Sequence, residues 1–238
     1  MRALRGIVPL TLFLVLAGPA LAVSERDKTD CADGSLDRQI AGCSRIIQDR
    51  SATARERFVS FYNRGNAYRD KFDYDRALAD YSEAIKLDPK QAFPRNNRGI
   101  VHRMKGNFES AIADFGEAIK LDPKHAGALS NRCWTLAIVG RDFSEALANC
   151  NESLRLNARD HNTWDSRGFA YLKMGDWERA IADYDKALGL YRWRAWSLYG
   201  RGWAKLKQGD TAAGQKDIAA AKAITADIAK QFADYGVK

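Results

Sequence analysis

A single motif recurs at a fixed spacing along most of this 238-residue chain and constrains its fold more than any other feature. Residues 58–89, FVSFYNRGNAYRDKFDYDRALADYSEAIKLDP, define the motif. The shift that places Gly65 on Gly99 also places Pro89 on Pro123. Units of this size, about 34 residues, bury their apolar faces only by stacking on their neighbours. The sequence therefore predicts a repeat protein.

Small and aromatic residues recur at fixed places in the motif. In the first copy these are Phe61, Gly65, Tyr68, Ala77, Tyr81, Ala84 and Pro89. The pattern resembles the tetratricopeptide repeat, a helix–turn–helix unit of the same length. The resemblance implies an all-α, right-handed superhelical solenoid, in which each repeat contributes a helix A and a helix B. Five repeats are expected, at 58–91, 92–125, 126–160, 161–194 and 195–226.

Segments on both sides of the repeats are predicted to close the stack. Residues 23–57 form an N-terminal capping segment, in which 23–35 are expected to be extended. Ser35 follows as the N-cap of a half-repeat helix over LDRQIAGCSRIIQD. Beyond the repeats, Ile228, Phe232 and Tyr235 are spaced as on one face of a helix. Residues 227–238 are therefore predicted to form a C-terminal capping helix.

Residues 1–22, MRALRGIVPLTLFLVLAGPALA, have the pattern of a secretory signal peptide. Arg2 and Arg5 precede an apolar run, and residues 20–22 form a small-x-small site for cleavage after Ala22. An uncleaved anchor is the alternative, but the apolar run is shorter than the roughly 20 residues of a spanning helix. We expect a periplasmic or secreted protein with no transmembrane segment in the mature chain.

Four cysteines suit an oxidising compartment, where disulfides persist. In the third repeat Cys133 replaces the small residue and Cys150 the aromatic one, and these two places face each other across the helical hairpin. We predict a Cys133–Cys150 disulfide, and a Cys31–Cys43 disulfide in the N-terminal segment; four buried thiols are the alternative. No metal site is expected, because the sequence has no CxxC motif and its three histidines lie far apart.

Helical geometry predicts which residues of each helix A line the inner, concave face. At about 100° per residue, positions 4, 8 and 11 of a repeat point into the stack, and positions 2, 5, 6, 9, 12 and 13 point the other way. In tetratricopeptide repeats this second face lines the concave groove. The predicted ligand-binding residues on it are Asn63, Asn66, Arg69, Asn97, Arg103, Asn131, Trp134, Phe169 and Trp203.

The N-terminal half of this groove is amide-rich and basic. Asn63, Asn97 and Asn131 resemble the asparagine ladder in the superhelix of O-linked N-acetylglucosamine transferase, where side-chain amides hold the main chain of an extended peptide. An amide donates and accepts at once, so such a ladder binds a backbone whatever its sequence. Arg69 and Arg103 are suited to hold an acidic side chain or a terminal carboxylate. The alternative is that all five are solvated surface residues.

The C-terminal half of the groove is aromatic. It contains Trp134, Phe169 and Trp203, together with Trp196 and Tyr199. An exposed apolar patch of this kind marks a binding site, either for an apolar peptide segment or for a glycan whose sugar rings stack on the indoles. The alternative is that neighbouring helices cover these rings as part of the core.

Two positions of the repeat, one on helix A and one on helix B, carry residues of opposite charge in nearly every copy. We interpret them as a ladder of ion pairs between helix A and helix B, rather than as a row of ligand-binding arginines. Position 7 holds Arg64, Arg98, Arg132, Arg167 and Arg201. Position 23 holds Asp80, Asp114, Asn149, Asp183 and Asp217.

Catalytic motifs are absent from the sequence: there is no GxSxG, no GxxxxGK[ST] and no HExxH. The formal charge of +8, or +6 without the signal peptide, is spread along the repeats and indicates no nucleic-acid partner. We expect a non-catalytic adaptor or assembly scaffold of the cell envelope, without a cofactor. It would bind an extended or helical segment of another envelope protein. The alternatives are a carbohydrate-binding helper in envelope polysaccharide handling and a self-associating structural component.

Overall fold

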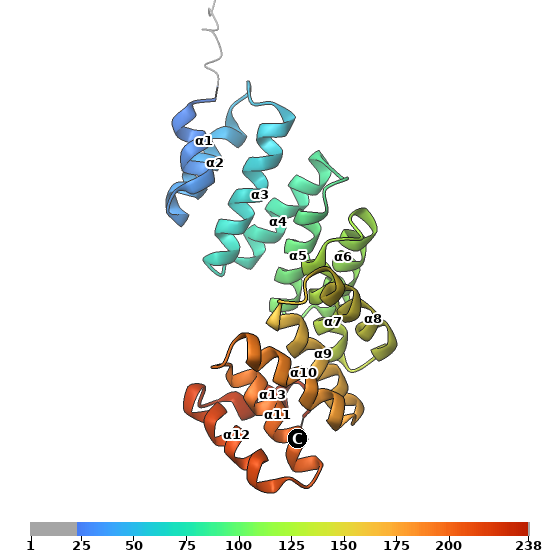
Figure 1. The fold of residues 1–238 in the computed structure, drawn as a ribbon. Helices are drawn as coiled ribbons and strands as arrows, with labels where there is room; N and C mark the ends of the chain where they lie inside the picture. The colour runs from blue at the N-terminus through green and yellow to red at the C-terminus, as the bar shows by residue number, and fades with distance from the viewer. Residues whose placement is uncertain (1–22, 238) are drawn as a thin grey trace, which may run out of the picture.

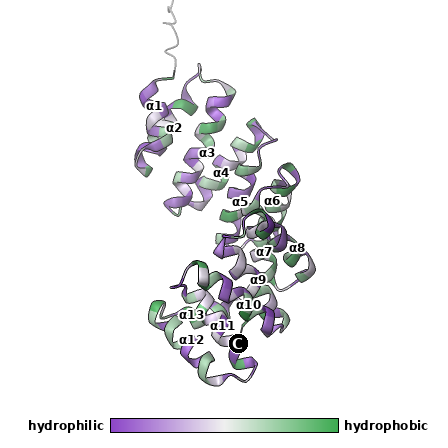
Figure 2. Ribbon diagram, viewed as in Figure 1, coloured by the Kyte–Doolittle hydropathy of each residue, from purple (hydrophilic) through white to green (hydrophobic). Residues whose placement is uncertain are grey.

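The computed structural model describes residues 23–237 and shows a stack of helical hairpins (Figure 1). Each hairpin consists of a helix A and a helix B, and hydrophobic and hydrophilic residues alternate along the helices (Figure 2). The helices A are α3 (Ala54–Asp70), α5 (Ala92–Met104), α7 (Ala126–Val139), α9 (His161–Met174) and α11 (Ala195–Lys207). The helices B are α4 (Tyr74–Leu87), α6 (Phe108–Leu121), α8 (Phe143–Leu156), α10 (Trp177–Leu190) and α12 (Thr211–Ile224). The predicted all-α solenoid is confirmed.

In the first, second and fourth repeats the hairpin closes where a glycine of helix A meets a ring of helix B. A Cβ atom on Gly65 would lie 2.9 Å from the ring of Tyr81, and one on Gly99 would lie 2.8 Å from the ring of Phe115. Both rings are fully buried. Because protein interiors are close-packed, a larger residue at either glycine would push the two helices apart.

The third repeat replaces this contact by a covalent bond. Cys133 of α7 is joined to Cys150 of α8, as predicted from their places in the repeat, and both are fully buried. The bond therefore holds helix A to helix B at the level where the first, second and fourth repeats pack a ring against a glycine.

An additional hairpin, α1 (Glu25–Asp33) and α2 (Leu36–Gln48), precedes the first repeat. The extended conformation expected for residues 23–35 is wrong. The Ser24 side chain accepts a hydrogen bond from the Asp27 amide and so caps α1, and the predicted Cys31–Cys43 disulfide joins α1 to α2. α2 packs on α3 as a helix B packs on the next helix A.

The last helix, α13 (Ile228–Asp234), does not continue the stack. Its buried side chain Phe232 contacts Phe169 of α9 and both Trp196 and Tyr199 of α11. The expected closing helix is thus present, but it lies across helices A (Figure 1). α12 forms the end of the stack.

A ladder of arginines links the hairpins. In the second repeat, Arg98 donates from Nε and Nη2 to the two carboxylate oxygens of Asp114 in α6, at 2.8 and 2.7 Å. Its Nη1 donates to Ser82 Oγ in the preceding helix B, α4, at 3.1 Å. One guanidinium therefore joins three helices. The same arrangement recurs at Arg64 with Asp80 and Ser44, at Arg167 with Asp183 and Asn151, and at Arg201 with Asp217 and Asp185.

The third repeat lacks both ladder partners. Asn149 stands at the aspartate position, and Gly116 lies beside Arg132 where α4 carries Ser82. Arg132 pairs with Glu145 instead, and its Nε has no hydrogen-bond partner among the described residues. The predicted ladder is confirmed in four repeats and is wrong for the third.

None of the helices between residues 23 and 237 is long and apolar enough to cross a membrane. The predicted signal peptide, residues 1–22, lies outside the described residues.

Because the ladder is incomplete in the third repeat, we expect replacement of different ladder arginines to lower the free energy of unfolding by different amounts. Arg98→Ala leaves the buried carboxylate of Asp114 without its two charged hydrogen bonds, so we expect a loss of about 2–3 kcal/mol in the free energy of unfolding. Arg132→Ala is the matched control, because Glu145 is 44% exposed and a pair of this kind contributes less than about 1 kcal/mol. Urea unfolding followed by circular dichroism measures both. Equal losses would contradict the ladder.

Candidate ligand-binding groove

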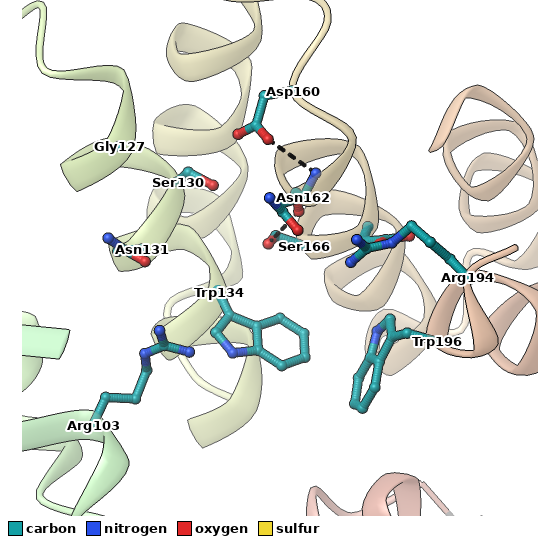
Figure 3. Close-up of a pocket in the computed structure, with 11 residues that line it drawn as sticks. Arg103, Gly127, Ser130, Asn131, Trp134, Asp160, Asn162, Ser166, Arg194 and Trp196 are labelled. Carbon is teal, nitrogen blue, oxygen red and sulfur yellow. Dashed lines mark hydrogen bonds and ion pairs between the residues drawn. The ribbon is translucent and has the colours of Figure 1, made fainter. Parts of the chain in front are cut away.

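A pocket of about 520 Å³ opens on the inner face of the solenoid. Helices α7 and α9 supply most of its walls, Arg103 reaches it from α5, and Arg194 and Trp196 come from the start of α11 (Figure 3). The pocket therefore lies where four successive helices A approach one another.

A cluster of buried hydroxyl groups brings α7 and α9 together beside this pocket. Thr163 of α9 donates to Ser130 of α7 at 2.8 Å, and its hydroxyl lies 3.1 Å from that of Ser153 in α8. Asp160 precedes α9 and caps it by accepting from the Asn162 amide, the contact drawn as a dashed line in Figure 3. These short side chains let two helices A pack directly on each other.

Arg103 forms no hydrogen bond and no ion pair with any of the described residues. Its Nε is buried and unpartnered, and burial lowers the pKa of the guanidinium. In Figure 3 the guanidinium lies next to Trp134 and below Asn131. Burying a charged group without a partner costs free energy, and a bound anion would offset that cost. Arg103 is therefore prepared for an anionic group of a ligand.

The second arginine of the pocket is already neutralised. Arg194 donates from Nε to Asp165 at 2.7 Å, and Ser197 donates to the other carboxylate oxygen at 2.5 Å. Asp165 is 3% exposed, and this burial raises the pKa of its carboxyl above its usual range. The electrostatic attraction of the pocket for an anion consequently comes from Arg103.

Two indoles form the apolar wall. The ring centroids of Trp134 and Trp196 are 5.1 Å apart, and the rings are nearly perpendicular. The Nε1 of Trp196 is buried and has no hydrogen-bond partner in the described part of the chain. The wall thus offers apolar area, which suits a ligand that has an apolar group.

Three of the nine residues predicted to bind ligand, Arg103, Asn131 and Trp134, line this pocket. The amides of the N-terminal half bind one another instead. Asn97 donates from Nδ2 to Asn66 Oδ1 at 2.9 Å, and Asn131 donates to Asn96 Oδ1 at 3.1 Å.

The remaining basic and amide candidates also have partners within the protein. Tyr81 donates its hydroxyl to Asn66 at 2.7 Å, and Arg69 pairs with the neighbouring Asp70 at 2.8 Å. Asn63 lies under α1, with its Nδ2 4.0 Å from Cys31 Sγ. The N-terminal half of the groove is therefore largely satisfied by its own hydrogen bonds.

The other aromatic candidates lie outside the pocket. Phe169 is fully buried beneath α13. Trp203 contacts Trp177 of α10, with the Lys207 ammonium 4.3 Å from the indole centroid. Of the three aromatic residues that the repeat places in one column, Trp134 and Phe169 are in contact, with ring centroids 5.1 Å apart, and Trp203 packs elsewhere.

Several pocket residues are not among the predicted contacts. Asn162 and Trp196 occupy position 2, Ser130 and Asp165 position 5, and Ser166 position 6, all of which helical geometry assigns to the inner face. Helical geometry alone therefore indicates these positions, and Trp196 belongs to the predicted aromatic half of the groove. Arg194 precedes a helix, and no sequence signal singles it out. Among the described residues no three His, Cys, Asp or Glu side chains form a group that could hold a metal ion.

Because the guanidinium of Arg103 is unpaired, we expect its removal to stabilise the protein. Arg103→Met keeps the apolar stem and removes the buried charge, so we expect the free energy of unfolding to rise by about 1 kcal/mol. Chemical denaturation measures this change. Arg155→Met, at an exposed arginine of α8, should change stability by less than about 0.5 kcal/mol. A clear loss of stability in Arg103→Met would indicate that Arg103 has a structural partner.

Comparison with known proteins agrees with this architecture. Models of the tetratricopeptide repeat match residues 58–91, 92–125 and 161–192. No curated protein is similar enough in sequence to count as a match. Many solved structures share the fold.

A tetratricopeptide repeat protein from Parabacteroides merdae ATCC 43184 has a TM-score of 0.71 at 16% identity, over 89% of this chain and 86% of its own. MamA from Desulfovibrio magneticus RS-1 has a TM-score of 0.62 at 17% identity, over 70% of this chain and 94% of its own. YrrB, described as a TPR protein with an unusual peptide-binding site, has a TM-score of 0.61 at 17% identity, over 82% of this chain and 98% of its own. Identities this low show a common fold. The three repeats matched by the family models identify the chain as a protein with tetratricopeptide repeats.

Proposed function

We propose that this protein is a non-catalytic adaptor of the cell envelope, and that it binds a segment of another protein in the pocket at Arg103. Proteins of this family are in general interaction modules, and the peptide-binding site named for YrrB gives one precedent for the fold. The proposal rests on the half-buried guanidinium of Arg103, whose buried Nε has no partner among the described residues.

The chemistry of the pocket defines the segment. A carboxylate, from an acidic side chain or from a chain terminus, pairs with Arg103 through charge-assisted hydrogen bonds. An apolar group next to it lies against Trp134 and Trp196. Asn131 is placed to hydrogen-bond the backbone of the segment. In this proposal Asn63, Asn66, Arg69 and Asn97 maintain the shape of the groove, because their side chains hydrogen-bond or pair within the protein.

The envelope location rests on two features. Residues 1–22 have the pattern of a signal peptide, and all four cysteines are paired as disulfides, which persist in an oxidising compartment. Export would bring the pocket into contact with envelope proteins.

A carbohydrate ligand is the second candidate, because two indoles flank a pocket that also contains hydroxyl, amide and carboxylate groups. A neutral sugar has no anion for Arg103. Its binding would therefore depend on Trp134 and Trp196 and be insensitive to replacement of Arg103.

Affinity capture from an envelope extract tests the proposal. The wild-type protein is compared with Arg103→Gln and with the matched control Arg155→Gln, which changes an exposed arginine of α8. We expect capture by the wild type and by Arg155→Gln, and its loss with Arg103→Gln. Isothermal titration with peptides from the captured partner should show binding to Arg103→Gln that is weaker by about tenfold to 150-fold, since a hydrogen bond to a charged group contributes about 1.5–3 kcal/mol.

Peptides with a free or an amidated C-terminus then distinguish a terminal carboxylate from an acidic side chain. Equal capture by all three proteins would contradict the assignment of Arg103. Binding of neutral oligosaccharides with unchanged affinity for Arg103→Gln would favour the carbohydrate function.

A further inference from the structure

The C-terminal helix α13 covers the aromatic part of the inner face. Phe232 stacks on Trp196 with ring centroids 4.1 Å apart, and its ring centroid lies 4.6 Å from that of Tyr199. Tyr235, directly after the helix, has its ring centroid 5.8 Å from that of Trp134. The segment of α13 and Tyr235 therefore contacts rings of α7, α9 and α11, three successive helices A.

α13 is amphipathic, and its apolar side faces this surface. Ile228 is 2% exposed and Phe232 is fully buried. On the opposite side Lys230 and Asp234 are exposed and pair with each other at 2.9 Å. The helix thus lies on the groove as a short amphipathic peptide would, with apolar residues inward and charged residues in solvent.

The end of α13 is held by a polar contact as well. Lys173 of α9 donates from Nζ to the carbonyl of Tyr235 at 2.7 Å, and to the carbonyl of Ile138 in α7 at 3.4 Å. Backbone carbonyls at the C-terminal end of a helix carry partial negative charge and attract cations. Lys173 therefore recognises the end of a helix without reading its side chains.

Closure of the stack does not require α13. The outer side of α12 presents Gln215, Lys216 and Lys222 to solvent beside small alanines, so α12 leaves no large apolar face for a further repeat to cover. A helix as short as α13 is also not stable by itself. α13 consequently depends on the groove for its structure and is joined to α12 only by the turn at residues 225–227.

We propose that this aromatic surface is a binding site for a short amphipathic helix of a partner protein, and that α13 occupies the site until such a helix displaces it. The partner helix has the pattern shown by α13: an aliphatic residue, an aromatic residue four positions later, a second aromatic residue three positions after that, and a helix end for Lys173. Because α13 is tethered, it competes at high effective concentration and lowers the apparent affinity of the partner.

This inference depends on the proposed function only in that the inner face binds polypeptide. The helix site uses Phe169, Trp196, Tyr199 and Lys173, whereas the pocket uses Arg103. Trp134 and Trp196 border both, so displacement of α13 would also uncover one wall of the pocket.

The test uses a fluorescent peptide of residues 225–237 and the full chain. Phe232→Ala weakens the docking of α13, and Lys230→Ala is the matched control on the exposed side of the same helix. We expect the peptide to bind Phe232→Ala about tenfold more tightly than it binds the wild type or Lys230→Ala. A peptide with alanine in place of its phenylalanine should not bind. Adding Asn131→Ala to Phe232→Ala should leave the affinity unchanged, which separates this site from the carboxylate pocket.

Equal peptide affinity for the three proteins, with the near-ultraviolet circular dichroism of Phe232→Ala unaltered, would overturn the inference. If Phe232→Ala does not fold, hydrogen exchange of the wild type tests whether α13 can leave the groove. We expect the amides of residues 228–234 to exchange faster than those of α11, and faster still with excess unlabelled peptide. Exchange of α13 only together with α11 would show that α13 is a permanent part of the core.

Discussion

Each ladder arginine joins three helices, and the arrangement of the hairpins depends on this contact. The aspartate on the same repeat neutralises the charge, and a side chain on the preceding helix B accepts the remaining hydrogen bond, as with Asp114 and Ser82 around Arg98. A partly buried guanidinium is tolerated because its charge is paired and its donors have acceptors. The second contact crosses from one repeat to the next, so it sets the register between hairpins as well as within them.

The third repeat departs from this arrangement, and the candidate pocket lies beside it. Arg132 has neither of its usual partners, and the Cys133–Cys150 disulfide holds α7 to α8 instead. On the next junction, hydroxyl groups rather than large apolar residues bring α7 against α9. Small polar residues at the close crossing of α7 and α9 leave space on the side of the crossing that faces the groove. The pocket is therefore a consequence of irregular packing, and Arg103 of the preceding repeat reaches into it.

Contacts within a repeat could be predicted from the sequence, and contacts between repeats could not. The exchange of a small and an aromatic residue for Cys133 and Cys150 indicates the disulfide, because both places belong to one hairpin. The hydrogen bond between Asn66 and Asn97 depends on how two neighbouring helices A are placed.

The contacts of the two terminal segments could not be predicted from the sequence either. The apolar spacing of Ile228, Phe232 and Tyr235 fits a cap and a groove occupant equally well, and only the three-dimensional path of the chain shows that α13 turns back over α9 and α11. The prediction for residues 23–35 is wrong because the Ser24 cap and the Cys31–Cys43 disulfide stabilise a helix there despite the polar composition of the segment.

The central claim is that Arg103 is unpaired in the free protein and pairs with a carboxylate when a segment binds. Nuclear magnetic resonance of the arginine Nε–Hε groups tests this directly, with Arg98 of the ladder as an internal reference. In the free protein the Arg103 signal should lack the shift and the protection from exchange that the carboxylate of Asp114 gives to Arg98. Addition of a peptide with a carboxylate next to an apolar residue should move the Arg103 signal towards that of Arg98 and leave Arg98 unchanged. An Arg103 signal that is already protected in the free protein, or that does not respond to the peptide, would contradict the account.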